Sequence, residues 1–199
     1  MCFFLCSGEP LGDNERETNP HRFNVSMMQA PAADPGCCLL SCLCPCCAQI
    51  YMRRKVLHND MTQYACCQGY MDGLVPGVTA GKCGEANCPN LCLCLEAFLC
   101  NGCAVSSTRM LVMDRYKLQP DEWDNRIIRF NNCIQALSVL CDCLAICFPR
   151  AGEMADTMRC IAQCTYASTQ GCMTAQVNVE FNRREASMQA PTYTDMERV

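Results

Sequence analysis

Residues 120–148 read PDEWDNRIIRFNNCIQALSVLCDCLAICF, and this stretch carries the strongest helix signal in the chain. Pro120 suits a first helical turn, and the acidic residues after it favour the positive end of the helix dipole. Apolar residues then recur at alternating steps of three and four, which is the spacing of one helical face. These residues are Ile127, Phe130, Ile134, Leu137, Cys141 and Leu144. The spacing predicts a long helix that packs this stripe against a neighbouring helix.

A second helix is expected over residues 153–172, directly after the first. Pro149 and Gly152 end the first helix, and the short turn between them favours an antiparallel hairpin. A further helix is expected over residues 104–118, whereas only Val177–Phe181 shows the alternation of a strand. We therefore predict a mainly α fold: a cysteine-rich helical domain with a C-terminal helical hairpin and irregular N- and C-terminal arms.

Composition divides the chain into three parts. Residues 1–36 are polar and contain several prolines, which predicts an extended N-terminal arm. Residues 37–174 form the predicted cysteine-rich helical domain, and residues 175–199 are expected to be a polar C-terminal tail. The 199-residue length suits one domain with its own core.

The best candidate for a membrane span is the apolar run from Cys133 to Phe148. The run has about 16 residues with Asp142 near its centre, and a span needs roughly 20 apolar residues. We interpret it as a buried core helix, with an interfacial or re-entrant segment as the alternative.

Charge and cysteine content restrict the class of protein. The formal net charge is −4, with 16 basic and 20 acidic residues, so a nucleic-acid-binding surface is not expected. The chain holds 23 cysteines, an odd number, and its first residues lack the apolar run of a secretory signal peptide. We therefore expect a protein on the cytoplasmic side of the cell, not a secreted one, with thiols that are mostly free or metal-bound.

Several cysteine clusters have the close spacing of metal ligands. Zinc-binding thiolates often come from Cys-x2-Cys pairs on a tight turn, as in Cys100-Asn101-Gly102-Cys103. The densest cluster places six cysteines within residues 37–47. The candidate zinc ligands are Cys37, Cys38, Cys42, Cys44, Cys46, Cys47, Cys100, Cys103, Cys141 and Cys143. The alternative is that these cysteines pack as small apolar core residues.

The N-terminus suggests a different use of sulfur. Cys2 and Cys6 flank the apolar residues Phe3-Phe4-Leu5, and cytosolic cysteines beside apolar residues are candidates for acyl chains. The alternative, which we favour, is an apolar hook that docks into the protein or into a partner.

Catalytic patterns are weak. His58 lies near Asp60, but with so many cysteines in the chain a Cys–His pair arises easily by chance. Thioredoxin-like chemistry needs its Cys-x2-Cys after a strand of a parallel sheet, and no such strand is predicted before Cys100. An enzyme is therefore not expected.

The residues Cys37-Cys38, then five residues, then Cys44-Pro45-Cys46 resemble the signature of the placenta-specific-eight family. This family includes cell-number regulators and plant cadmium-resistance proteins. Residues 109–118 resemble the family's arginine-rich segment that ends in a tyrosine. A second group of cysteines resembles the family's second cysteine cluster, namely Cys133, Cys141, Cys143 and Cys147.

The resemblance covers residues 37–148 and departs from the family pattern in two places. Residues 60–86 look inserted, and the second cluster lacks the family's cysteine-cysteine-alanine-x-x-glutamine ending. The resemblance implies association with a membrane, oligomerisation, and a role in growth control or in the handling of divalent metals.

Three functions from different classes fit these patterns. The first is a non-enzymatic structural or interaction protein that docks through its arms onto protein partners in a larger assembly, or forms a homo-oligomer. The alternative is a membrane-associated protein that handles or transports divalent metals, with peripheral membrane contact. A thiol or redox enzyme ranks third.

Overall fold

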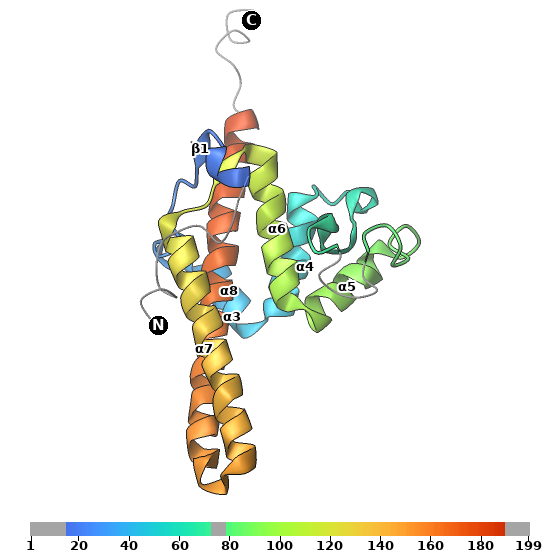
Figure 1. Ribbon diagram of the computed structural model, residues 1–199. Coiled ribbons are helices and arrows are strands. Elements are labelled where there is room, and N and C mark those ends of the chain that lie inside the picture. The colour runs from blue at the N-terminus through green and yellow to red at the C-terminus, as the bar shows by residue number, and fades with distance from the viewer. Residues whose placement is uncertain (1–14, 73–78, 190–199) are drawn as a thin grey trace, which may run out of the picture.

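The computed structural model describes residues 15–72 and 79–189 (Figure 1). Helices dominate these ranges, so the predicted mainly α fold is confirmed. The α-helices are α2 (Ala30–Ala33), α3 (Pro35–Leu43), α4 (Pro45–Val56), α5 (Pro89–Leu99), α6 (Asn101–Tyr116), α7 (Glu122–Cys147) and α8 (Gly152–Gln189). The shorter elements are η1 (Glu15–Thr18), β1 (His21–Arg22), η2 (Met61–Gln63), η3 (Cys66–Gly69), β2 (Leu118–Gln119) and η4 (Pro149–Ala151).

Helices α3 and α4, and likewise α5 and α6, form two bent pairs with a cysteine at each bend. Cys44 and Cys100 are the N-caps of α4 and α6, and their backbone angles are nearly equal, φ −136° and ψ 71° against φ −140° and ψ 65°. Pro45 explains the first bend, because a proline disfavours helical geometry in the residue before it. The α5–α6 pair bends by 117°.

The sequence after each bend repeats. Cys44 and Cys100 each begin a Cys-x2-Cys-Ala motif, and an arginine follows nine residues after the first cysteine in both. These two arginines, Arg53 and Arg109, are both buried. The two bent pairs are therefore similar in sequence as well as in shape.

The main apolar core lies where α4 and α6 pack against the C-terminal half of α8. Met52, Val112, Val177 and Phe181 are buried there together. Because Val177 and Phe181 are four residues apart, they lie on one face of a helix, and the strand alternation expected at this point is wrong. The predicted start of a polar tail at residue 175 is corrected too, since α8 continues to Gln189.

The N-terminal segment is docked on the helices instead of extending freely from residue 15 onward. β1 pairs in parallel with β2, and Met27 and Ala30 are fully buried. Gln176 on α8 donates a hydrogen bond to the Val25 carbonyl at 2.9 Å. The predicted extended arm is therefore corrected for residues 15–36, because the apolar side chains of Met27 and Ala30 are buried in the core.

Helices α7 and α8 form the predicted C-terminal hairpin, closed by η4. Asp121 and Asp124 make a capping box at the start of α7, in which the Asp124 carboxylate accepts the Asp121 backbone N–H at 2.8 Å. Figure 1 shows that the closed end of the hairpin extends beyond the remaining helices. This part of α7 has α8 as its one large neighbour among the described elements.

Candidate functional site

The contact between α7 and α8 is lined by polar and small side chains. Every seventh residue is buried on each helix, which is the spacing of a helix–helix seam. On α7 these residues are Asp124, Asn131 and Ser138, and on α8 they are Ala155, Ala162, Thr169 and Gln176. Gln135 reaches across and donates a hydrogen bond to the Ala162 carbonyl at 2.7 Å.

The outward-facing surface of α7 is apolar in the second half of the helix. Val139 and Leu140 are 60% and 59% exposed, and Ile146 is 84% exposed. Because consecutive helical residues point about 100° apart, these side chains cover more than one narrow face of α7. Helix α7 is therefore polar at its contact with α8 and apolar where it faces outward, whereas the outward face of α8 carries the exposed charged residues Glu153, Asp156 and Arg159.

Two sequence expectations for α7 are corrected by this arrangement. The stripe expected to pack on a neighbour does so only in part: Cys141 is buried and Ile127 packs on the core, whereas Phe130, Leu137 and Leu144 are half-exposed. The segment Trp123–Cys147 is long and apolar enough for a membrane span, with mean hydropathy 1.5, yet only 17% of its apolar 18-residue window is buried. Among the described residues, α8 is the main neighbour of α7, and the start of α7 also packs on the helical body, where Ile127 contacts the cluster of Met27, Val105 and Met173. Most of α7 is therefore not the buried core helix that the sequence predicted.

Charged groups of the hairpin are paired near its closed end. Arg159 on α8 donates to Asp142 on α7 at 2.7 Å and to Asp156 at 3.1 Å. Arg150 and Glu153 lie exposed at the turn itself. The apolar outer surface of α7 thus lies between this polar turn and the helical body.

Helices α3 and α5 add further exposed apolar side chains. Leu43 is 76% exposed at the end of α3, and Phe98 and Leu99 are 70% and 83% exposed at the end of α5. Helix α3 has no charged residue, and the one charged residue of α5, Glu96, is buried. Both helix ends at the bends therefore present apolar, uncharged surface.

Glu96 is held inside the body by a dense set of hydrogen bonds. Arg53, which is fully buried, donates to one carboxylate oxygen at 3.0 Å. The Tyr64 hydroxyl and the Cys67 backbone N–H each donate to the other oxygen at 2.8 Å. Burial, and then the neighbouring Glu96 carboxylate, raise the pKa of Tyr64, so the phenol stays protonated and donates.

Four of the ten predicted zinc ligands are paired as disulfides. Cys44 is bonded to Cys47, and Cys100 to Cys103. Each disulfide lies at the N-terminus of a helix, where the helix dipole favours a thiolate when the bond is reduced. As disulfides, these four sulfurs do not ligate a metal.

Cys37, Cys38 and Cys42 lie on α3 against α8. A side-chain hydrogen bond links Cys38 to Cys42, and Cys172 on α8 contributes to the same thiol cluster. Burial, and then the Asp34 carboxylate, raise the pKa of Cys37 to about 11. The Cys37 thiol therefore stays protonated near neutral pH and packs as an apolar group.

The remaining predicted ligands do not converge. Cys141 is buried and Cys143 is exposed, because residues two apart on a helix point in nearly opposite directions. Cys46 lies on α4 beside the Cys44–Cys47 pair. Among the described residues, none of the ten belongs to a group of three side chains close enough to share a metal ion. Cys2 and Cys6, the lipidation candidates, lie outside the described residues.

Cysteines outside the ten predicted zinc ligands do come together. The ligand atoms of Cys66, Cys83 and Glu85 lie within 4.8 Å of one another, as do those of Cys66, Cys67 and Glu96. The available signal was the run of cysteines at positions 83, 88 and 92 beside an acidic residue. Spacing along the chain did not show that Cys66 joins them.

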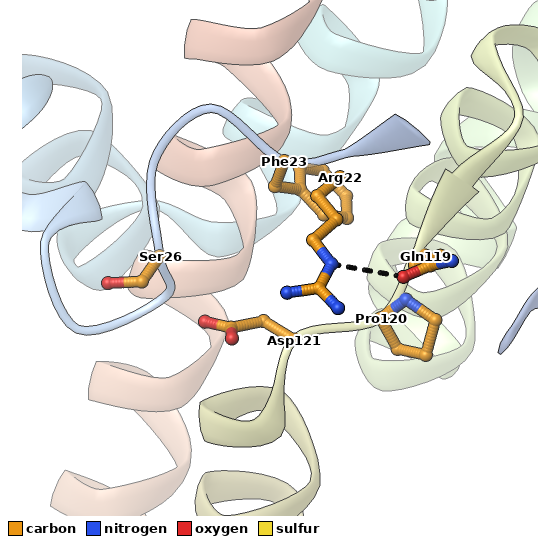
Figure 2. Close-up of a pocket in the computed structure, with 6 residues that line it drawn as sticks. All are labelled: Arg22, Phe23, Ser26, Gln119, Pro120 and Asp121. Carbon is orange, nitrogen blue, oxygen red and sulfur yellow. Dashed lines mark hydrogen bonds between the residues drawn. The ribbon is translucent and has the colours of Figure 1, made fainter. Parts of the chain in front are cut away.

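A cavity of about 200 Å³ lies between the N-terminal segment and the start of α7 (Figure 2). Its lining includes Arg22, which donates a hydrogen bond to Gln119 at 3.1 Å, and Ser26 and Asp121 at the other side. These side chains offer polar contacts to a small molecule. The lining includes no histidine or lysine that would activate Ser26.

Compared with known proteins, the chain matches no family model, no curated protein and no solved structure. The resemblance to the placenta-specific-eight family therefore stays a prediction that rests on the residues quoted for it.

Proposed function

We propose that this protein is a non-enzymatic membrane protein whose α7–α8 hairpin inserts into a lipid bilayer and whose helical body stays at the membrane surface. The observation that carries the proposal is the distribution of polarity on α7. Asn131 and Ser138 are buried between the helices, whereas Val139, Leu140 and Ile146 face outward.

This distribution suits lipid better than water. In water, burial of apolar area is the main force that joins two helices, so the apolar stripe belongs inside the contact. In a bilayer the tails are as apolar as leucine, and helices associate through small residues and polar side chains. Ala155 and Ala162 on α8, and the hydrogen bond from Gln135 to the Ala162 carbonyl, are contacts of the second kind.

The dimensions of α7 fit the same proposal. Its 26 residues correspond to a length of about 39 Å, and the hydrocarbon core of a bilayer is about 30 Å thick. Trp123 is exposed near the start of the helix, at the end where an interfacial aromatic residue is expected. The paired charges of Asp142 and Arg159 lie toward the other end.

The exposed apolar ends of α3 and α5 support contact with the interfacial region. These exposed residues, Leu43, Phe98 and Leu99, are separate from the hairpin in sequence. The helices α3 and α5 that carry them expose no charged side chain. Apolar surface distributed over three separate elements suits a continuous lipid surface. A second copy of the chain would cover one contiguous patch.

Membrane extraction tests the proposal. Leu140→Arg replaces an exposed apolar side chain with one that costs about 3–4 kcal/mol more at the centre of a bilayer, equivalent to a several-hundred-fold loss of insertion. We expect the wild-type chain to stay with membranes after alkaline carbonate treatment and to float with lipid vesicles, and the variant to be released. Met188→Arg is the matched control, because Met188 is 63% exposed near the end of α8, away from the hairpin turn.

Two results would contradict the proposal. One is complete release of the wild-type chain by carbonate. The other is a water-soluble oligomer that Leu140→Arg dissociates, because it would show that a second copy covers the apolar surface. The fluorescence of Trp123, the one tryptophan of the chain, gives a second readout, and we expect a blue shift on addition of vesicles.

A further inference from the structure

The loop before α5 and the turn η3 bring together two thiols and a carboxylate from distant positions in the chain. Cys66 begins η3, and Cys83 and Glu85 lie just before α5. Their ligand atoms all lie within 4.8 Å of one another. We propose that Cys66, Cys83 and Glu85 bind one Zn²⁺ ion, with water in the fourth position.

The side chain of Glu85 is the strongest reason for this proposal. It is only 3% exposed. One carboxylate oxygen accepts the Cys66 backbone N–H, and the other is buried and has no hydrogen-bond partner among the described residues. A buried carboxylate without a compensating charge is costly, and a cation bound at this oxygen removes the cost.

The local backbone holds the two loop ligands in place. Gly84 separates Cys83 from Glu85 and has φ +79°, a conformation that residues with a side chain rarely adopt. Because of this turn, Cys83 lies exposed while Glu85 points inward. The site therefore has one solvent-facing ligand, through which an ion can enter.

The second group of potential ligands is already used by the fold. Both carboxylate oxygens of Glu96 accept hydrogen bonds, and Arg53 supplies the positive charge next to it. A cation there would replace an existing ion pair. Glu85 has no such ion pair among the described residues, so the first group is the metal site.

The donor set selects the type of ion. Two thiolates favour soft or borderline metals, and a carboxylate oxygen is also a regular ligand of zinc. Each thiol must lose its proton to bind, so Zn²⁺ displaces two protons, from Cys66 and Cys83, while Glu85 binds as the carboxylate. This site differs from all ten of the zinc ligands expected from sequence, and it does not depend on the proposed membrane insertion.

Zinc titration of the full chain tests the inference. The reduced protein, in mild detergent and stripped of metal with a chelator, is titrated with Zn²⁺ against a chromophoric competitor, and native mass spectrometry counts the bound ions. We expect one ion per chain at this site. Glu85→Gln and Cys83→Ser each remove one ligand. We expect each to weaken zinc binding by at least about tenfold, because loss of a residue that only supports a metal ligand already weakens binding by about 10–100-fold.

Cobalt distinguishes direct ligation from an indirect effect on folding. Co²⁺ bound by thiolates gives a charge-transfer band to which a carboxylate does not contribute. We expect Cys83→Ser to reduce this band for each bound Co²⁺, and Glu85→Gln to weaken binding while leaving the band for each bound Co²⁺ unchanged. Cys160→Ser, which removes an exposed thiol on α8, is the matched control. The proposal would be overturned if the zinc affinity were the same in Glu85→Gln, Cys83→Ser and the wild type. It would also be overturned if Cys160→Ser alone lost zinc binding.

Discussion

Replacing Arg53 by methionine is expected to cost a large part of the stability of the helical body. Arg53 is fully buried and donates to Glu96 at 3.0 Å, to Thr108 at 2.9 Å and to the Ala104 carbonyl at 3.1 Å, with a further contact to Ser107. Methionine fills much of the volume but leaves the Glu96 carboxylate buried without its partner. Breaking a buried ion pair in this way costs about 3–5 kcal/mol, against a typical total free energy of unfolding of about 5–15 kcal/mol.

A second substitution isolates the electrostatic part of this loss. In the double variant Arg53→Met with Glu96→Gln, the buried charge is gone, while the amide oxygen still accepts hydrogen bonds from Tyr64 and Cys67. We expect the double variant to unfold at a higher urea concentration than Arg53→Met alone. Arg54→Met is the control, because Arg54 is exposed and its loss is expected to change the free energy of unfolding by no more than about 0.5 kcal/mol.

Urea unfolding followed by circular dichroism, on the full chain in mild detergent, measures these differences. A loss below about 1 kcal/mol in Arg53→Met would refute the reasoning, because that value is typical of an exposed ion pair. A double variant that is no more stable than Arg53→Met would show that the unpaired Glu96 charge is not the cause.

Two further predictions concern α3 and its contact with α8. The pKa of Cys37, raised to about 11 from an ordinary value of 9.0, leaves about 100-fold less thiolate at pH 8. Alkylation of Cys37 by iodoacetamide, followed by mass spectrometry, should therefore accelerate about tenfold per pH unit up to about pH 11; a plateau near pH 9 would contradict the raised pKa. Gly171→Ala places a Cβ 2.8 Å from the Cys42 sulfur and 3.1 Å from the Cys38 carbonyl oxygen, and we expect it to lower the free energy of unfolding by about 1–3 kcal/mol. Gly152→Ala, which meets no atom within 4 Å, is the control, and equal stability of the two variants would show that α3 shifts away at no cost.

Local signals predicted three of the helices, α6, α7 and the first part of α8, but did not separate α2 to α5 within residues 30–99. Pro120 and the acidic residues after it predicted the start of α7, and Pro149 with Gly152 predicted the turn between α7 and α8. The end of α8 was missed because a polar composition after residue 175 was interpreted as a tail. The buried face of that segment consists of residues spaced along a helix, such as Val177 and Phe181.

The environment of the α7 stripe was predicted only in part, because Cys141 is buried as expected and Phe130, Leu137 and Leu144 are half-exposed. Helical periodicity shows that one face is apolar, but it does not show whether another helix or a lipid surface covers that face. The answer depended on which side of α7 meets α8. The small residues Ala155 and Ala162 allow α8 to approach the polar side, and the apolar side is left outward.

The prediction of the cysteine sites was incomplete because sequence spacing does not show contacts between distant residues. Cys44-x2-Cys47 and Cys100-x2-Cys103 are visible as close pairs, and the structure joins each pair. The group at Cys66 and Cys83 needs a contact between residues far apart in sequence. Such contacts follow from how η3 packs beside α5, which no local pattern predicts.

The two similar bent helix pairs explain how the body keeps its charges away from its apolar surface. Arg53 and Arg109 occupy equivalent positions after the two Cys-x2-Cys-Ala motifs, and each is buried against a carboxylate, Glu96 for the first and Asp124 for the second. Arg109 also donates to Gln176 at 2.6 Å and so joins α6 to both helices of the hairpin. Because Arg109 and Asp124 pair at the base of the hairpin, the charges there are neutralised inside the protein. The buried Arg109–Asp124 pair therefore fixes the base of the α7–α8 hairpin to the helical body.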